Sequence, residues 1–102
     1  MVIDMISIGL YKENTKDSSL PSIYDDINRF TGDKNKVLQY MKKCRVLAAA
    51  PSILHDVITG QPIHKELAFM TDGVYGWRSD LIYYVENYDL RLPDDFMRYV
   101  TQ

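Results

Sequence analysis

The segment 71–100 constrains the fold most, because turn, strand and helix signals follow one another in it with few residues between them. Asp72 and Gly73 separate two short apolar runs. Both residue types tolerate the positive φ angles that a two-residue hairpin turn requires. The segment therefore predicts a β-hairpin over about residues 67–77.

Two helices are predicted directly after this hairpin. Ser79 is a candidate N-cap, and Asp80 suits the positive end of the helix dipole, so we expect a helix from Asp80 to Tyr88. Pro93 suits the first position of a last helix, because its missing N–H group is not needed there. Asp94 and Asp95 then fall in the first turn of that helix.

The first third of the chain predicts one strand, one loop and one short helix. Apolar residues alternate with other types from Ile6 to Leu10, and this period of two is typical of a strand. The polar segment 12–19 indicates a loop. Ser22 and the proline before it are helix-start signals, and three apolar residues then share one face. This pattern predicts a short helix over about residues 21–30.

The middle of the chain predicts a basic helix followed by a buried strand. Asp33 is a candidate N-cap for a helix over residues 34–44, in which Val37, Met41 and Cys44 share one side. The short apolar run 46–50 predicts a buried strand. The segment 51–65 contains two prolines and a glycine, and it predicts mostly loop.

These elements predict a fold of the α+β class. Strands and helices are interleaved, but the two best strands form a hairpin, so we expect a small, mainly antiparallel sheet covered on one face by about four short helices. A chain of 102 residues suits one domain, residues 1–102. Hydrophobic residues make up 46% of it and charged residues 25%, which is typical of a folded soluble domain.

Several sequence features indicate a cytoplasmic protein without a membrane segment. No run approaches the ~20 apolar residues that a spanning helix needs. The first residues carry Asp4 and lack the basic region of a signal peptide. Cys44 is the one cysteine, which excludes an intramolecular disulfide and suits a reducing compartment.

Catalytic and metal-binding chemistry has little support in the sequence. His55 and His64 are the two histidines, nine residues apart, whereas a metal site needs three or four ligands. Cys44 falls on an apolar helix stripe, which favours a structural cysteine over a nucleophile. We therefore predict no enzyme activity, no catalytic residue, no metal and no cofactor. A small hydrolase that uses these three residues is the alternative.

The paired acids and the clustered tyrosines can each have either a structural role or a binding role. The pairs 25–26 and 94–95 are explained most simply as acids at helix starts, although they suit a binding face as well. Most of the tyrosines are expected to pack in the core. Tyr83 and Tyr84 are adjacent, however, and cannot both point to the buried side of a helix. One exposed tyrosine among acids would suit a protein interface.

The segment 34–45 contains five basic residues and no acid. Such a helix face is a candidate for nucleic-acid binding. RNA-binding modules usually add aromatic residues for base stacking, and Tyr40 is the one aromatic residue in this segment. The whole chain has a net charge of −2. We interpret the segment as a solvated helix face, and we keep a nucleic-acid-binding regulator as the alternative function.

The second half of the chain resembles a known group of bacterial proteins. The group comprises the immunity proteins encoded beside polymorphic toxins, including those of contact-dependent inhibition. The resemblance covers about residues 46–100, with a weaker match over 46–51 and 56–60. Members commonly have proline after the tryptophan, where this chain has Arg78. The residues that carry the resemblance are Thr71, Asp72, Gly73, Val74, Trp77, Asp80, Leu81, Tyr83, Tyr84, Val85, Leu92, Pro93 and Phe96.

This resemblance implies a protein that binds and neutralises a cognate toxin by covering or distorting its active site. The toxins of such pairs are often nucleases and are usually basic. Acidic side chains would then speed and orient association, and aromatic side chains would slow dissociation. The expected toxin contacts are Asp72, Asp80, Tyr83, Glu86, Asp89, Asp94 and Asp95.

Overall fold

The computed structural model describes residues 5–101, apart from the side chains of His64 and Lys65. It contains a four-stranded sheet with the order β1-β4-β3-β2. The central pairs β2–β3 and β3–β4 are antiparallel, and β1 is parallel to β4. The strands are β1 (Ile6–Ser7), β2 (Arg45–His55), β3 (Pro62–Thr71) and β4 (Tyr75–Arg78). The helices are α1 (Lys12–Thr15), the 3₁₀ turn η1 (Ile23–Asp25), α2 (Lys34–Lys42), α3 (Ser79–Tyr88) and α4 (Asp94–Thr101).

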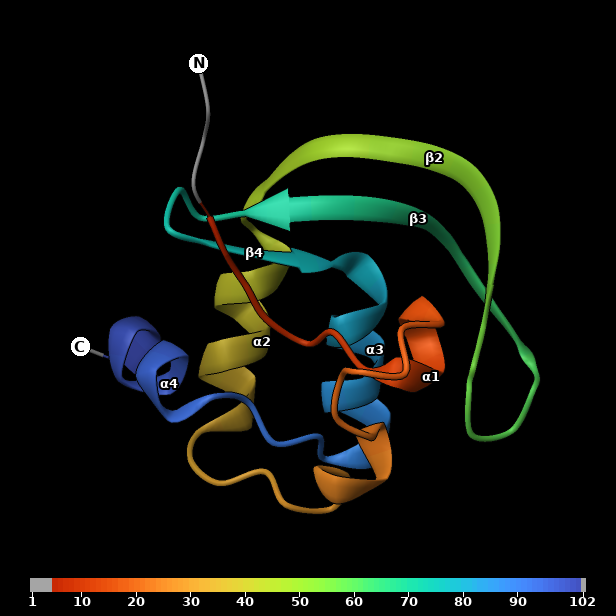
Figure 1. The fold of residues 1–102 in the computed structure, drawn as a ribbon. Coiled ribbons are helices and arrows are strands. Elements are labelled where there is room, and N and C mark those ends of the chain that lie inside the picture. Colours follow the sequence, from red (N-terminus) through yellow and green to blue (C-terminus); the bar gives the residue numbers. More distant parts are fainter. Residues whose placement is uncertain (1–4, 102) are drawn as a thin grey trace.

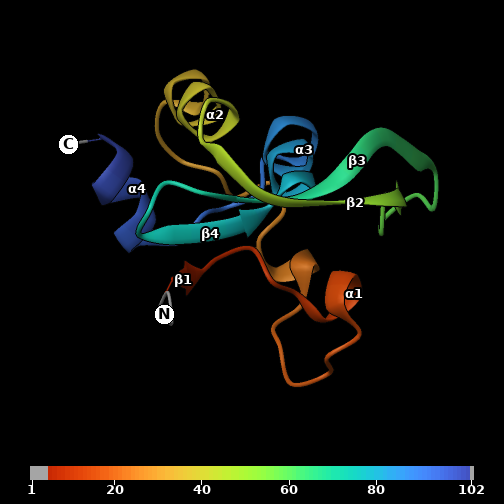
Figure 2. The ribbon, with the colours of Figure 1, turned by 90° about the horizontal axis from the view of Figure 1, so that it is seen from above.

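This architecture confirms the predicted α+β class with a mainly antiparallel sheet. The helices do not all cover one face, as was predicted: α2 and α3 lie on one side of the sheet, and the N-terminal segment with α1 lies on the other (Figure 2). The chain ends in α4, beyond the β3–β4 turn and away from α1 (Figure 1). The Cα radius of gyration is 13.2 Å, close to the ~13 Å expected for a compact domain of this length.

The hairpin predicted around Asp72 and Gly73 is confirmed as the β3–β4 turn, but three residues, 72–74, connect the strands, and Gly73 has a positive φ whereas Asp72 does not. Asp72 Oδ1 accepts hydrogen bonds from the amides of Val74 (2.9 Å) and Tyr75 (2.7 Å). The Thr71 hydroxyl donates to the Tyr75 carbonyl over 2.7 Å, within the buried side of the turn. The aspartate side chain therefore closes the turn in the way that its residue type predicts.

Two predictions for the middle of the chain are wrong. The run 46–50 was expected to be buried, but it belongs to the outer strand of the sheet, where Val46 is 51% exposed. The segment 51–65 was expected to be mostly loop, but β2 continues through Pro51 to His55 and β3 begins at Pro62. A register shift between Ala50 and Ile53 accommodates the proline, which an outer strand tolerates.

The N-terminal third also differs from its prediction. The segment 12–19 contains the one-turn helix α1, in which the Tyr11 amide donates to the Asn14 side chain over 3.0 Å. The helix expected over 21–30 shrinks to the single turn η1. The amides of Asn28 and Phe30 instead donate to the carbonyls of Tyr88 and Asp89 at the end of α3. Tertiary hydrogen bonds therefore replace the helical bonds that the local pattern suggested.

Helix starts are confirmed at two places and wrong at a third. Asp33 caps α2 by accepting from the Lys36 amide over 3.1 Å, and α4 begins directly after Pro93. Ser79 is not the N-cap of α3, because that position belongs to Arg78. The Ser79 hydroxyl instead bonds to β3, accepting from the Ala68 amide and donating to the Glu66 carbonyl.

Aromatic rings form the centre of the core between the sheet and the helices. Phe96 of α4 is 0% exposed and lies edge-on to Tyr75 and Trp77 of β4, with ring centroids 5.1 Å and 5.6 Å away. Tyr40 of α2 approaches the same ring at 6.5 Å. Phe96 thus joins α4, α2 and the sheet, and the residues Ile23, Val37, Met41, Leu81, Val85, Leu90 and Leu92 surround this group.

Replacement of Gly9 by alanine should destabilise the protein by about 1–2 kcal/mol or more, because a left-handed residue costs about this much and the new methyl group adds a clash. Gly9 has a φ of +74°, and a Cβ atom there would lie 2.6 Å from two methyl carbons of Leu81. Gly73→Ala is the matched control, since Gly73 also has a positive φ but nothing within 4 Å of its Cβ position. Urea unfolding compares the two variants. Equal losses would show that contact with Leu81 adds nothing.

Candidate functional site

Asp56 is a buried carboxylate that holds the β2–β3 loop against α3. It is 1% exposed and accepts hydrogen bonds from the hydroxyls of Tyr83 (2.7 Å) and Tyr88 (2.5 Å). The amides of Ile58 and Thr59 donate to its other oxygen. Burial opposes ionisation, but these four donors outweigh it and hold the pKa of Asp56 below its ordinary value. Tyr83 was an expected toxin contact, but its hydroxyl donates a hydrogen bond to Asp56 within the protein.

Asp80, another expected toxin contact, lies inside the protein. It is 4% exposed and accepts a 3.1 Å hydrogen bond from Arg78. Burial raises the pKa of Asp80, although the neighbouring guanidinium opposes that shift. Arg78 also donates to the Asn14 carbonyl over 2.6 Å and so connects the sheet to α1. Arg78 therefore has a structural role, and Asp80 is almost fully removed from the surface.

Asp72 is half-buried and combines its turn contacts with a bond to α2. The Tyr40 hydroxyl donates to Asp72 Oδ2 over 2.6 Å. Burial disfavours the charged carboxylate, but the bonds from Tyr40 and the turn amides lower the pKa of Asp72 overall. The same contact and burial raise the pKa of Tyr40. Asp72 is therefore mainly a structural residue that offers part of its side chain to solvent.

The other four expected contacts are exposed, and each has a basic partner. Lys42 pairs with Glu86 over 2.7 Å, and Lys34 pairs with Asp89. Within the C-terminal region, Arg91 pairs with Asp94 and Arg98 pairs with Asp95. Solvent-exposed ion pairs are worth little, so basic groups of a partner protein can replace these bases. Two lysines of α2 are occupied in this way, which reduces the basic surface available to nucleic acid.

Two residues of the hydrolase alternative, Cys44 and His55, line different hollows, and the side chain of the third, His64, lies outside the described part of the structure. Cys44 lines an open hollow with Tyr40, Lys43, Arg45, Thr71 and Asp72, and that hollow contains no histidine. His55 lines a different hollow, beside Arg78 and Asp80. Burial and the nearby Asp72 raise the pKa of the Cys44 thiol, which disfavours the nucleophilic thiolate. No group of three or more candidate metal ligands occurs among the described residues.

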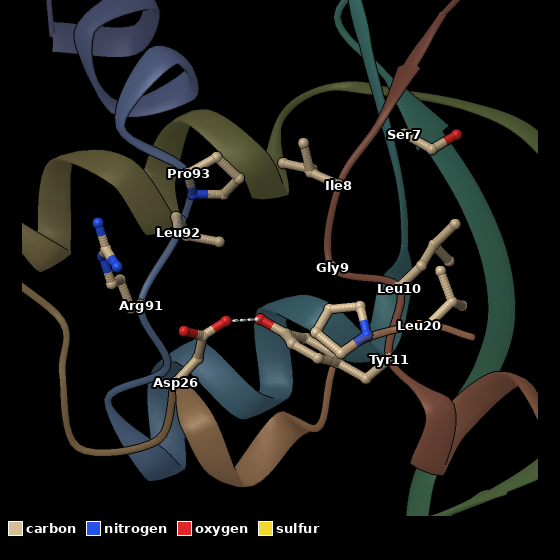
Figure 3. Close-up of a pocket in the computed structure, with 11 residues that line it drawn as sticks. Ser7, Ile8, Gly9, Leu10, Tyr11, Leu20, Asp26, Arg91, Leu92 and Pro93 are labelled. Carbon is tan, nitrogen blue, oxygen red and sulfur yellow. Dashed lines mark hydrogen bonds between the residues drawn. The ribbon is translucent and has the colours of Figure 1, made fainter. Parts of the chain in front are cut away.

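A groove lies between the N-terminal segment and the connection from α3 to α4 (Figure 3). Its cavity volume is about 360 Å³. Polar groups occupy the side of Asp26, Tyr11 and Arg91, and apolar groups form much of the remaining wall (Figure 3). The apolar residues of this Arg91 groove are Ile8, Leu10, Leu20, Pro21, Leu92 and Pro93.

Main-chain hydrogen bonds bring the two sides of the Arg91 groove together. The Arg91 amide donates to the Asp26 carbonyl over 2.9 Å, which places the residues that follow α3 against those that follow η1. The Tyr11 hydroxyl donates to Asp26 Oδ2 over 2.7 Å (Figure 3). Burial and this bond raise the pKa of Tyr11, so its hydroxyl stays protonated as a donor. In the described structure, Asp26 Oδ1 accepts no hydrogen bond from another residue.

The Arg91 groove unites acids that are far apart in the sequence. Asp26 lines it, and Asp94 contacts its edge through the ion pair with Arg91. The sequence analysis explained the pairs 25–26 and 94–95 separately, as helix starts. Arg91 was not a candidate at all, because a single exposed arginine after a helix carries no sequence signal. Asp94 is the predicted contact that the structure places beside this groove, through its ion pair with Arg91.

No helix in the described part of the chain has the length and apolar character needed to cross a membrane. Comparison with protein-family models, with curated proteins and with solved structures finds no match to this chain.

Proposed function

We propose that this chain is a cytoplasmic immunity protein that binds one basic toxin domain, such as a nuclease, and blocks its working surface without chemistry of its own. The observation that supports this most is the Arg91 groove, where apolar walls enclose the Asp26 carboxylate and the exposed Asp94, paired with Arg91, lies at the edge. Such a site fits a basic side chain of another protein.

A lysine or arginine of the toxin would enter the groove in a defined way. Its methylene groups would pack on Leu20, Leu92 and Pro93, because long basic side chains bury their stems on apolar surface. Its charged group would reach Asp26 Oδ1, which accepts no other hydrogen bond from the described residues. A charge-assisted bond of this kind is about twice as strong as a neutral one. Asp94 and Asp95 would attract the toxin before contact.

The resemblance to immunity proteins is compatible with this location of the interface. The residues that carry it are largely structural: Thr71 and Asp72 close the turn, and Trp77 and Phe96 form the core. Of the groove residues, only Leu92 and Pro93 belong to the shared pattern. Immunity proteins must each match a different toxin, so contact residues are expected to be individual while scaffold residues are shared.

The proposal requires a gene for a large secreted protein beside this one, and co-expression with the C-terminal domain of that protein tests it. The wild-type chain should co-purify with that domain in a one-to-one complex and abolish its toxicity. Asp26→Asn should weaken the complex by about tenfold or more, since a hydrogen bond to a charged group is worth ~1.5–3 kcal/mol. Titration calorimetry measures the change.

Asp25→Asn is the matched control, because Asp25 is the exposed neighbour and does not line the groove. It removes the same charge and should leave the affinity nearly unchanged. If both variants lost the same affinity, the groove would not be part of the interface, and the effect of Asp26→Asn would be a long-range electrostatic one. Absence of any complex with the neighbouring toxin domain would overturn the proposed function itself.

A further inference from the structure

Strand β2 is an edge strand of the sheet, and one of its two sides is not paired with another strand. It is eleven residues long and pairs with β3 alone among the described strands (Figure 1). No backbone hydrogen bond in the described structure joins its outer side to another element. A long outer strand presents a row of free N–H and C=O groups, which is a template for another extended strand.

Pro51 and the register shifts on either side of residues 48–50 are the features of β2 that oppose such pairing. From Val46 to Leu54 the strand has no charged residue. Proteins usually protect an outer strand with charge, with proline or by covering it. Here Pro51 removes one donor from the row, and in an antiparallel pair centred on Ala49 it lies opposite Leu47, while residues 48–50 keep their donors. Leu47 is 42% exposed, and Phe69 beside it on β3 is 43% exposed.

We propose that β2 pairs with β2 of a second copy of this chain, antiparallel and about a two-fold axis at Ala49. The two four-stranded sheets would then form one continuous eight-stranded sheet. This contact is isologous, because the same residues contribute from both copies. The proposed contact lies at the edge of the sheet opposite β1, and it does not depend on the proposed function.

The charge pattern favours a second copy over a charged partner. In the proposed register Arg45 of one copy lies opposite Ile53 of the other, so the two arginines are eight residues, or about 26 Å, apart along the strand at 3.3 Å per residue. That separation exceeds the Debye length of ~8 Å in physiological salt, so their repulsion is screened. A basic toxin would find no acid on this strand, which is why it is assigned to the Arg91 groove instead.

Side-chain size favours the same register. Ala48, Ala49 and Ala50 are small, so a second backbone can approach without collision. Leu47 and Phe69 line a hollow of about 160 Å³ beside Gly76 and Arg78. This side of the sheet faces α1, because Arg78 bonds to Asn14 there. When two copies pair in the antiparallel direction, the α1-facing sides of both sheets lie on the same side of the joined sheet. The apolar surfaces of the two copies would then be adjacent and shield each other from water.

The mass of the purified chain in solution tests this proposal. Sedimentation equilibrium over a wide concentration range should give twice the chain mass of 11.9 kDa at high concentration. Leu47→Lys should raise the dimer dissociation constant by about tenfold or more, because it places a charged group in the apolar surface that Leu47 and Phe69 of the two copies would form. Ile6→Lys is the matched control: Ile6 is also an exposed apolar residue (55%), but it lies in β1 at the opposite border.

A cysteine placed on the axis gives a second readout that does not depend on the stability of the lysine variants. Ala49→Cys, in a Cys44→Ser background, should form a disulfide-linked dimer under mild oxidation, since directly paired strand residues have Cα atoms close enough for a disulfide. Ser18→Cys in the same background lies in an exposed loop and should stay monomeric. The proposal is overturned if the chain has a mass of 11.9 kDa at every concentration, if Ile6→Lys disrupts the dimer and Leu47→Lys does not, or if both cysteines cross-link equally.

Discussion

Phe96→Ala is expected to destabilise the protein by about 3–5 kcal/mol, the usual cost of removing a fully buried phenylalanine side chain. Phe96 is 0% exposed and contacts rings from β4 and α2. Its loss would leave a cavity among Tyr40, Tyr75 and Trp77 and detach α4 from the sheet. Urea unfolding followed by tryptophan fluorescence reports directly on this region, because Trp77 is the one tryptophan.

Tyr99→Ala is the matched control for Phe96→Ala. Tyr99 lies on the same helix and contacts Tyr75 at a ring distance of 5.4 Å, but it is 41% exposed. Its truncation should cost about 1 kcal/mol, in the range of one aromatic pair. A similar loss for both variants would mean that α4 is held by its outer surface, and that Phe96 is not the centre of the core.

The elements that the sequence predicted well are those whose signals act locally. The turn at Asp72 and Gly73 was predicted from residue types that tolerate turn conformations, and in the structure the aspartate side chain closes it with bonds to its own neighbours. Asp33 was predicted for the same reason, since a cap bonds to an amide three residues away. Such contacts require no knowledge of the rest of the fold.

Strand β2 was mispredicted because its conformation depends on a distant partner. Two prolines and a glycine between positions 51 and 62 indicate a loop when read locally. Pairing with β3 provides enough backbone hydrogen bonds to carry β2 past Pro51, with a register shift there. Its apolar character also suggested burial, whereas the helices on that side of the sheet leave the outer strand exposed. Burial is a tertiary property that a short run of valine, leucine and alanine does not determine.

The candidate site had still less support in the sequence. The Arg91 groove exists because the Arg91 amide bonds to the Asp26 carbonyl, and no pattern indicates a bond between residues 65 positions apart. The argument that adjacent Tyr83 and Tyr84 cannot both be buried by a helix was sound but incomplete. The β2–β3 loop folds over α3, so Tyr83 bonds to Asp56 while Tyr84 accepts from the Val57 amide. One segment therefore satisfies both hydroxyl groups.

Asp56→Ala is expected to destabilise the protein by about 2–4 kcal/mol, because each buried donor left without an acceptor costs ~1–3 kcal/mol and water can satisfy part of the four. The variant would release the β2–β3 loop from Tyr83 and Tyr88 of α3. Chemical unfolding measures the loss. Asp56→Asn is the control, since its amide oxygen keeps one acceptor in place, and it should cost less than alanine. A loss below about 0.5 kcal/mol, the scale of an ordinary surface substitution, would show that the loop is held by other contacts.

The pH dependence of stability should identify the Asp56 contact in particular. The pKa of Asp56 is lowered in the folded protein, so its contribution is fully present above its ordinary pKa of 3.8 and is lost as the pH falls through the folded value. At the alkaline end, the bond to Asp56 and burial raise the pKa of Tyr88 from 10.0 to about 12. The contribution of Tyr88 is therefore present below pH 10 and is lost as the pH rises through 12. In Asp56→Ala the tyrosinate absorbance of Tyr88, resolved by difference against Tyr88→Phe, should appear at lower pH than in the wild type. An unchanged titration would mean that burial alone raises the pKa of this tyrosine.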